Sequence, residues 1–523
     1  MPGRLIAIPM RSRRSVATFA PPLLDPNTLR AAAQTVIEAA VAAGAQFADV
    51  RLNERREFRA GDAGMDGLLR FTYGCGLRVR VNGREAFVGS LDLSHDGLVQ
   101  TASCAVAMAR QLPPSDHASS FLSTPNVTGE WVAPLEIDPF AVSPDDHVFI
   151  SHGFTTLARR WNVDAGGYFH WESENRIFAS SAGSLVTQRW TRCWPNFGVG
   201  ATTWRDDRGS TSLAISSFAP YTGGMEAILG PERHEALESA ADEVAMLVRS
   251  PIAVGEVGRR PVVMDGHATA MVLGTALVPS LSAARLIGEE QDGAGTSFLT
   301  SAQPNPGQSL FAPSLEMWVE QEATQYGAAR WDDEGVATRA FPLISAGTIT
   351  NVLGTRTTIP AIAEAPELRG TVIPRTPSVP GVAFASDITL APGARPPVIG
   401  IRPASSDSSL AALIATMQDG LIVRGGSYAN LDQQGANGMV QPRFLIEVRR
   451  GVVVRRLIDT RLEFATRKLC AAITTVGDPS TVQWAPCTLG GGMLWNATQS
   501  VVKAPAMHFR EINVVPNRAY DQH

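Results

Sequence analysis

A histidine followed by a glutamate lies in the helical stretch that begins at Pro231, and such a pair commonly starts a zinc-binding helix. That helix needs a second histidine about one turn later, so that two imidazoles hold the metal while the glutamate acts as a base. Here the pair is His234 and Glu235, and Glu238 stands one turn later. Because acidic side chains interact favourably with the positive end of a helix, we predict a solvated first turn there and no metal site.

Two further side chains could bind a metal, and one glycine run could bind phosphate. His267 lies near the start of a helix predicted over 265–277, where capping or a surface contact is the commoner role of a histidine. A single thiolate without imidazole partners does not hold zinc usefully, so we expect Cys487 to be a buried, inert thiol. The run Gly490-Gly491-Gly492 lacks the Lys-Ser/Thr of a phosphate-binding loop, which favours a flexible turn.

The stretch from Val262 to Phe298 carries the most informative pattern. A Val-Val-Met-Asp run ends at Asp265, and two later runs cover 284–288 and 294–298. These runs resemble, in type and order, the active-site segment of the TldD/PmbA family, zinc metallopeptidases that degrade or trim peptides. In catalytic members a His-Glu-x-x-x-His motif begins nine residues after the aspartate, and this spacing reaches Gly274 here. The motif therefore falls on 274–279, where both histidines and the glutamate are absent.

The three motif positions are occupied by Gly274, Thr275 and Pro279. A catalytic zinc needs about three nitrogen, sulfur or carboxylate ligands and an open position for water, and a nearby carboxylate takes the proton of that water. Glycine and proline have no donor side chain, and threonine cannot act as a base near neutral pH. We therefore predict a vacated metal motif, no catalytic residue, and no metal or other cofactor in this chain.

Further stretches resemble the same family, in the same order, across nearly the whole chain. The resemblance also gives Cys487 the position of a carboxy-terminal cysteine that supplies the third zinc ligand in catalytic relatives, so this thiol is the residual ligand candidate. As a set, the motifs resemble a TldD chain that has lost its metal more than a typical PmbA/TldE chain. The further stretches cover residues 44–51, 74–84, 131–140, 181–188, 353–356, 387–393 and 419–421.

The resemblance implies a role without catalysis in this chain. The family typically pairs two related chains, one with the zinc motif and one without it, and the substrate peptide lies as an extended strand held by main-chain hydrogen bonds. The leading hypothesis is a non-catalytic subunit of such a heterodimeric zinc metallopeptidase. It would shape the groove for a peptide or unfolded protein and support a motif-bearing, TldD-like paralogue that holds the zinc. The alternative is a stand-alone peptide-binding pseudoenzyme, acting singly or as a homodimer. A peptidase with an unusual metal site ranks third.

Composition and charge favour a cytoplasmic protein that binds neither nucleic acid nor a membrane. The chain has 523 residues, 44% hydrophobic, which is enough for two or three domains. A net charge of -5 argues against electrostatic binding of nucleic acid, and no apolar run reaches the roughly 20 residues of a membrane span. The five cysteines include no C-x-x-C pair, so neither a disulfide framework nor a zinc finger is indicated. Residues 11–15 faintly resemble a twin-arginine export signal, but the usual apolar core is missing.

The sequence predicts an α+β fold with a disordered tail over 1–26 and three domains. An amino-terminal α/β domain over 27–118 has helices over 27–43 and 96–110 and short strands over 48–52, 76–81 and 85–88. After a linker over 111–130, a middle mixed domain within 119–254 contains helices that begin at Pro144 and Pro231. A strand-rich carboxy-terminal domain over 255–517 carries the vacated metal motif, and its clearest strands cover 443–448, 451–457 and 508–515.

Overall fold

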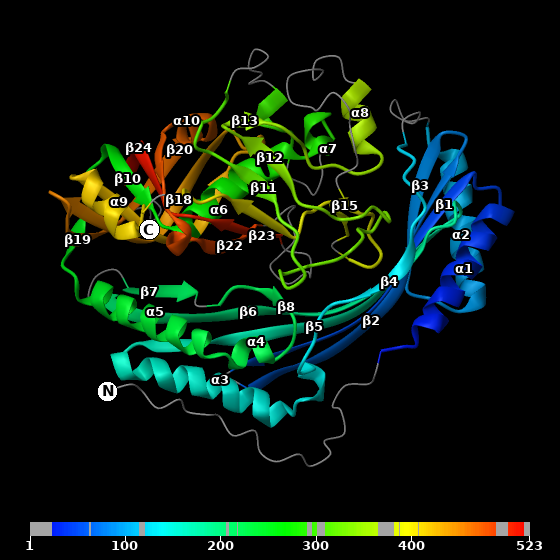
Figure 1. Cartoon of the computed structure of the whole chain (residues 1–523), viewed down its shortest axis with the longest axis horizontal. Helices are drawn as coiled ribbons and strands as arrows, with labels where there is room; N and C mark the ends of the chain where they lie inside the picture. The colour runs from blue at the N-terminus through cyan, green and yellow to red at the C-terminus, as the bar shows by residue number, and fades with distance from the viewer. Residues whose placement is uncertain are drawn as a thin grey trace.

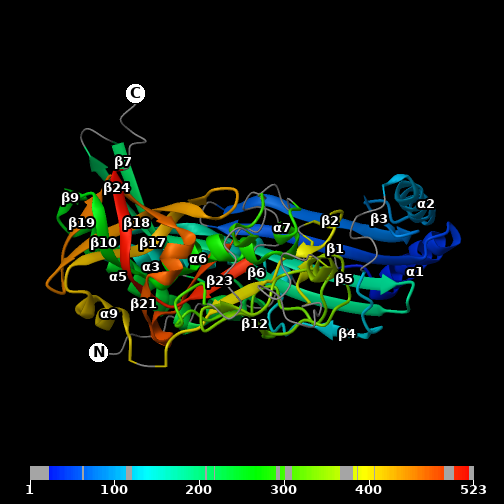
Figure 2. The same cartoon turned by 90° about the horizontal axis from the view of Figure 1, so that it is seen from above.

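The computed structural model has the α+β fold that the sequence predicts. It describes residues 23–516 except 62–63, 114–120, 206–208, 217, 290–294, 301–308, 365–380, 386, 406 and 488–499. Most of the predicted tail over 1–26 therefore lies outside the described residues. One long curved sheet forms the base of the molecule, and the carboxy-terminal half of the chain lies on its concave side (Figure 1). Figure 2 shows the elongated outline from above.

The base sheet has the strand order β3-β2-β1-β5-β6-β4, with β7 and β8 paired to β6. Its centre is antiparallel, because β1 pairs along its length with both β2 and β5, and β5 with β6. Strands from the predicted amino-terminal and middle domains thus share one sheet, which runs across the boundary placed between residues 118 and 119. The strands are β1 (Phe47–Gly61), β2 (Gly64–Val81), β3 (Arg84–Ser90), β4 (Thr128–Val132), β5 (Asp164–Ser180), β6 (Leu185–Arg205), β7 (Gly209–Ser216) and β8 (Tyr221–Thr222).

Helices cover the convex side of this sheet (Figure 1), and several of them begin after a capping side chain. Helix α1 (Pro26–Ala42) begins after Asp25, whose carboxylate accepts a hydrogen bond from the Asn27 N–H. Helix α3 (Pro144–Ala158) begins after Ser143 in the same manner. Helix α2 (His95–Gln111) is confirmed to within one residue at each end, and α5 (Pro231–Arg249) begins at Pro231 as predicted. A short α4 covers Glu226–Leu229.

The predicted strands over 48–52 and 76–81 are far too short. Strand β1 has 15 residues because it continues through the polar run Asn53-Glu54-Arg55-Arg56, and β2 has 18 because it begins at Gly64. These four side chains are buried, since helices cover one face of the sheet and the carboxy-terminal half covers the other. Alternation of apolar and polar residues predicts a strand with one buried face, and a polar run normally indicates a loop. This strand is buried on both faces and therefore does not show the alternation.

The described part of the carboxy-terminal half contains two large sheets, with helix α6 (Gly266–Leu277) between them, and a two-stranded sheet of β14 and β15. One sheet has the order β17-β10-β24-β20-β18-β19-β9, with β21 on β24, and the other has the order β13-β12-β11-β16-β23-β22. Most residues of α6 are buried, and many of its apolar side chains belong to a hydrophobic cluster that joins both sheets. The predicted strands at 443–448, 451–457 and 508–515 are confirmed as parts of β18, β19 and β24.

Besides these sheets and α6, the described part of this half has four short α-helices. Helix α9 packs on the outer face of the first sheet, where Leu413 and Met417 join a cluster with Ile422 and Ile446. The strands are β9 (Ile252–Val254), β10 (Gly258–Met264), β11 (Met317–Val319), β12 (Phe341–Ser345), β13 (Thr348–Ile349), β14 (Ala383–Phe384), β15 (Gly393–Ala394), β16 (Val398–Ile401), β17 (Gly420–Leu431), β18 (Asn437–Arg449), β19 (Val452–Ile458), β20 (Thr460–Ala465), β21 (Ile473–Val476), β22 (Gln483–Cys487), β23 (Ser500–Ala504) and β24 (Met507–Pro516). The helices are α7 (Ala283–Leu286), α8 (Thr358–Glu364), α9 (Leu410–Met417) and α10 (Thr466–Ala471). No helix within the described ranges is long and apolar enough to cross a membrane.

Candidate functional site

Helix α6 carries the positions where the metal motif would stand, and Asp265 fixes its start. The Asp265 carboxylate caps the helix by accepting from the Ala268 N–H at 2.7 Å. Its second oxygen accepts from the Gly425 N–H at 2.8 Å and lies 3.4 Å from the Arg424 guanidinium. The aspartate that opens the resembling segment therefore attaches α6 to strand β17.

None of the three motif positions offers a ligand to a metal. Gly274 faces β23, where a Cβ atom built on it would lie 2.8 Å from Cγ2 of Val502. The Thr275 hydroxyl donates to the Met271 carbonyl oxygen at 2.7 Å, which is a bond within the helix. Pro279 begins a 3-10 turn (Pro279–Leu281) that follows the end of α6. A valine side chain thus packs where the first histidine would leave the helix.

Cys487 lies beside the first of these positions. It is the last residue of β22, and its thiol sulfur is 3.5 Å from the Gly274 carbonyl oxygen. The side chain is buried, and burial raises the pKa of the thiol to about 12, so it is protonated at neutral pH. The structure therefore brings the residual ligand candidate together with Gly274, although the two are 213 residues apart in sequence.

Zinc, which the resemblance associates with this place, does not fit the side chains present. Zinc needs several nitrogen, sulfur or carboxylate donors that converge on one point. Here a protonated thiol contacts a glycine carbonyl, the threonine hydroxyl is bonded within the helix, and a valine packs against the glycine. Among the residues that the structure describes, no cluster of three or more His, Cys, Asp or Glu side chains could hold a metal.

The other sequence candidates have structural roles. His267 is half-buried, and its Nδ1 lies 2.7 Å from the Trp484 carbonyl oxygen, so this contact attaches the start of α6 to β22. His234 packs its ring 5.1 Å from the Phe154 ring, while Glu235 is exposed, as predicted for a solvated first turn. Residues 490–492 lie outside the described residues.

A buried charged network between the base sheet and the carboxy-terminal half was not predicted. Asp333, in a loop after β11, receives a hydrogen bond from Arg51 on β1 at 2.8 Å and pairs with Arg176 on β5. Arg192 on β6 donates to Glu172 at 2.9 Å. The polar residues within 51–55 and the acidic run 332–334 were the sequence signals for this network. Neither signal indicates that the two segments contact each other in the folded chain. This network fixes the base sheet against the half that contains α6.

Aromatic side chains form a second contact between the same two parts. Trp194 on β6 lies 5.9 Å from Trp484 on β22 and 5.1 Å from Tyr326, measured between ring centroids. Trp484 also lies 6.4 Å from the His267 ring. The start of α6 is therefore connected to the base sheet through His267 and these rings.

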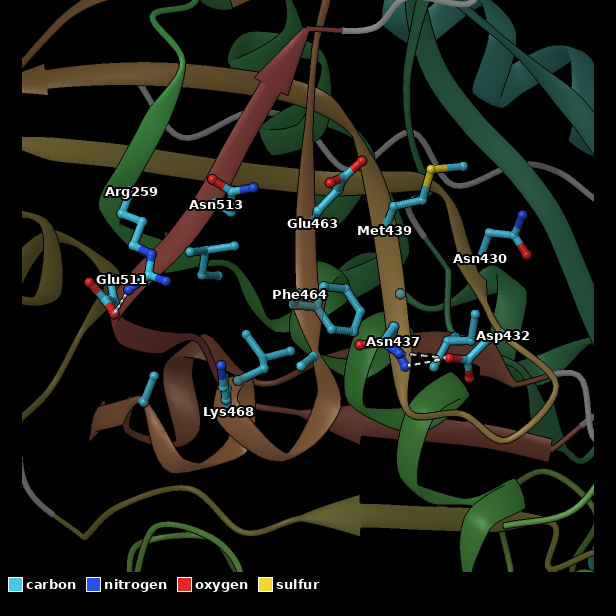
Figure 3. A pocket seen from close by; sticks show the side chains of 16 residues that line it. Arg259, Asn430, Asp432, Asn437, Met439, Glu463, Phe464, Lys468, Glu511 and Asn513 are labelled. Carbon is cyan, nitrogen blue, oxygen red and sulfur yellow. Dashed lines mark hydrogen bonds and ion pairs between the residues drawn. The ribbon is translucent and has the colours of Figure 1, made fainter. Parts of the chain in front are cut away.

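A broad, open cavity of about 880 Å³ lies elsewhere, across β24, β20, β18 and β17 (Figure 3). Two of its acidic side chains have polar partners, because Arg259 donates to Glu511 at 3.1 Å and Asn437 donates to Asp432 at 2.9 Å. None of its lining residues is one of the motif positions or Cys487. We therefore assign the candidate functional site to the contact between α6 and β22.

The family assignment follows from two matching family models. The model of the PmbA/TldA metallopeptidase C-terminal domain matches residues 257–516, which include α6 and Cys487. The model of PmbA/TldA metallopeptidase domain 1 matches residues 69–109. The chain belongs to the TldD/PmbA metallopeptidase family.

Solved structures share the fold at low sequence identity. TldE from Thermococcus kodakarensis is 15% identical, with a TM-score of 0.68, over 92% of this chain and 100% of its own. A candidate modulator of DNA gyrase from Bacteroides thetaiotaomicron is 15% identical, with a TM-score of 0.67, over 93% of this chain and 98% of its own. A candidate modulator of a DNA gyrase from Thermotoga maritima is 14% identical, with a TM-score of 0.66, over 93% of this chain and 100% of its own. No curated protein matches the chain in sequence.

Proposed function

We propose that this chain is a non-catalytic subunit of a heterodimeric zinc metallopeptidase of the TldD/TldE type. The observation that carries the proposal is the contact of Gly274 with Val502 and Cys487. A valine occupies the space that a ligand on α6 would need, and the remaining thiol has a pKa of about 12. A zinc-dependent cleavage step would then need a related chain with an intact motif.

In this role the chain shapes the peptide groove and supports the catalytic partner. A substrate peptide or unfolded protein would lie as an extended strand, with main-chain hydrogen bonds supplying affinity. The buried ion pair between Arg51 and Asp333 supports this role, because it holds two large parts of the chain in one arrangement. Such a rigid scaffold is useful to a partner even without chemistry of its own.

The proposal places a large interface on this chain. Obligate interfaces typically bury more than about 2,000 Å² and are apolar at their centre. The isolated subunit should therefore associate with itself or aggregate, because it would expose that surface. The alternative, a stand-alone peptide-binding pseudoenzyme, would instead be a stable monomer or homodimer.

Metal analysis and co-purification test the proposal together. The full chain is purified alone and with a motif-bearing paralogue, and zinc content, sedimentation and peptide cleavage are measured for each sample. We expect no stoichiometric zinc and no cleavage from this chain alone, and a one-to-one complex with the paralogue that is active. The paralogue alone is the matched control. About one tightly held zinc per chain in this subunit, lost on Cys487→Ala, would contradict the proposal, as would a monodisperse monomer that ignores the paralogue.

A further inference from the structure

An apolar hairpin tip lies at one end of the elongated molecule, the end opposite α1 and α2 (Figures 1 and 2). Strands β18 and β19 turn at Arg450 and Gly451, and both have a positive φ, as a tight two-residue hairpin loop requires. The next three residues are Val452, Val453 and Val454, which are 65%, 48% and 44% exposed. Because successive residues of a strand point to opposite faces, both faces of the tip are apolar and uncovered.

Backbone contacts hold this tip in place. The Gly451 N–H donates to the Gln418 carbonyl oxygen at 2.7 Å, just after α9. The Arg450 N–H donates to the Asp419 carboxylate at 2.9 Å. The exposed valines are therefore presented by a fixed part of the fold.

The edge strand β9 continues the apolar surface alongside β19. It pairs with β19 in parallel and is the last strand of its sheet. Ile252 and Val254 on this strand are exposed, and so is Val257 just after it. Single exposed apolar residues are ordinary on a protein surface, whereas a group of six at one end marks a surface that contacts an apolar partner.

The charge at this end is opposite in sign to that of the whole chain. Segments 249–260 and 447–459 contain seven arginines and three acidic residues, and Asp419 adds a fourth acid beside the tip. The whole chain carries a net charge of -5. The apolar tip is therefore surrounded by a local excess of positive charge.

The arginines nearest the tip are only partly neutralised. Glu447 accepts from Arg449 at 2.8 Å and from Arg455 at 2.5 Å, so one carboxylate serves two guanidinium groups. Both arginine side chains remain partly exposed. The Arg450 side chain, at the tip itself, is exposed and has no ion pair to any described residue. Positive charge thus lies directly beside the valines.

We propose that this end of the molecule binds peripherally to an anionic lipid surface, with Val452 and Val453 inserted among the lipids and the arginines at the level of the headgroups. Interfacial binding combines burial of apolar side chains with attraction of basic residues to anionic lipids, and it needs no spanning helix. Arginine suits the boundary, because its long side chain keeps the charge in water while the apolar neighbours enter.

The shape of the tip favours a lipid surface over a protein partner. A protein would need a complementary groove to cover a hairpin that is apolar on both faces, whereas a fluid lipid layer surrounds such a tip. The sequence-based expectation of no membrane contact rested on span length and on the charge of the whole chain, and neither describes a local patch. The inference goes beyond the proposed function and is independent of it, because it involves neither zinc nor a paralogue.

Flotation of the full chain with lipid vesicles tests the contact, with phosphatidylcholine alone and with added phosphatidylglycerol. We expect binding to the anionic vesicles that weakens as the salt concentration rises. Val452→Asp removes apolar contact and adds a repelled charge, so it should weaken binding about tenfold or more. Val132→Asp is the matched control, because Val132 on the edge strand β4 of the base sheet is also 65% exposed. It should bind as the wild type.

A second variant tests the charge separately from the apolar contact. Arg450→Gln leaves the valines in place and should weaken binding to the anionic vesicles about fivefold. Circular dichroism of each variant separates loss of the contact from misfolding.

Four results would overturn the proposal. They are no flotation with anionic vesicles at low salt, equal binding to neutral and anionic vesicles, and equal binding by Val452→Asp and Val132→Asp. The fourth is self-association that Val452→Asp abolishes in a chain that ignores vesicles, which would assign the tip to a protein interface.

Discussion

The contact between Gly274 and Val502 should make Gly274→Ala unfavourable in a helix where alanine normally stabilises. A Cβ at this position would lie 2.8 Å from Cγ2 and 3.2 Å from Cβ of Val502, closer than the 3.5–4.0 Å of an ordinary carbon contact. Val502 is fully buried, and its strand pairs with both β16 and β22. A β-branched side chain in such a strand has little freedom to turn aside.

The expected change in the free energy of unfolding of Gly274→Ala follows from two opposing effects. Overpacking of a buried site costs about 1–3 kcal/mol, whereas alanine is favoured over glycine inside a helix by about 1 kcal/mol. The free energy of unfolding of Gly274→Ala should therefore be unchanged or up to about 2 kcal/mol lower than that of the wild type. In a Val502→Ala background both Cγ atoms are absent and only the Cβ contact at 3.2 Å remains, so the same substitution should raise the free energy of unfolding by up to about 1 kcal/mol. The expected coupling between the two sites is about 1–3 kcal/mol.

A double-mutant cycle in urea measures this coupling. Unfolding is followed by tryptophan fluorescence and circular dichroism, and the two probes must give the same transition, because a chain with several cores can unfold in stages. Gly153→Ala is the matched control, since Gly153 lies inside α3 and an added Cβ would meet nothing within 4 Å. That control should stabilise in both backgrounds. If Gly274→Ala stabilises the wild type as much as Gly153→Ala does, Val502 does not fill the ligand space and the reasoning fails.

Three further predictions concern other described residues. Of the five cysteines only Cys104 is exposed, so a thiol reagent should modify one thiol per native chain, and modification of Cys487 before unfolding would contradict its burial. Asp333→Asn should lower the free energy of unfolding by about 3–5 kcal/mol, because it leaves two buried arginines underpaired. Glu511→Gln removes an exposed ion pair and should lower it by at most about 1 kcal/mol. Equal effects of the two substitutions in urea denaturation would refute this reasoning. Burial lowers the pKa of His147 below its ordinary 6.5, so its contribution to stability is present above that pH and is lost as pH falls towards the folded pKa. Unfolding midpoints measured between pH 7.5 and 5 should fall less steeply for His147→Gln than for the wild type.

The sequence by itself determined the features that depend on neighbouring residues. Helix starts at Asp25, Ser143 and Asp265 follow from side chains that bond the first free N–H groups of the helix, which is a local interaction. The spacing from Asp265 to Gly274 likewise predicts where the metal motif of the family would fall, because the positions of ligands along one helix are a matter of sequence order. Family membership could also be predicted from the sequence, because the motifs of the family are short and lie in a constant order along the chain.

Only the tertiary structure decided what depends on packing between distant segments. The run 53–56 is polar, and its assignment to a long buried strand required the covering half of the chain and its buried acids such as Asp333. Cys487 could be aligned with a family position, but its contact with Gly274 arises from the pairing of β22 beside α6. The role of Val502 had no sequence signal, because one buried valine resembles any other. Side chains that fill a space are identified by the atoms around them, and those atoms come from parts of the chain that only folding brings together.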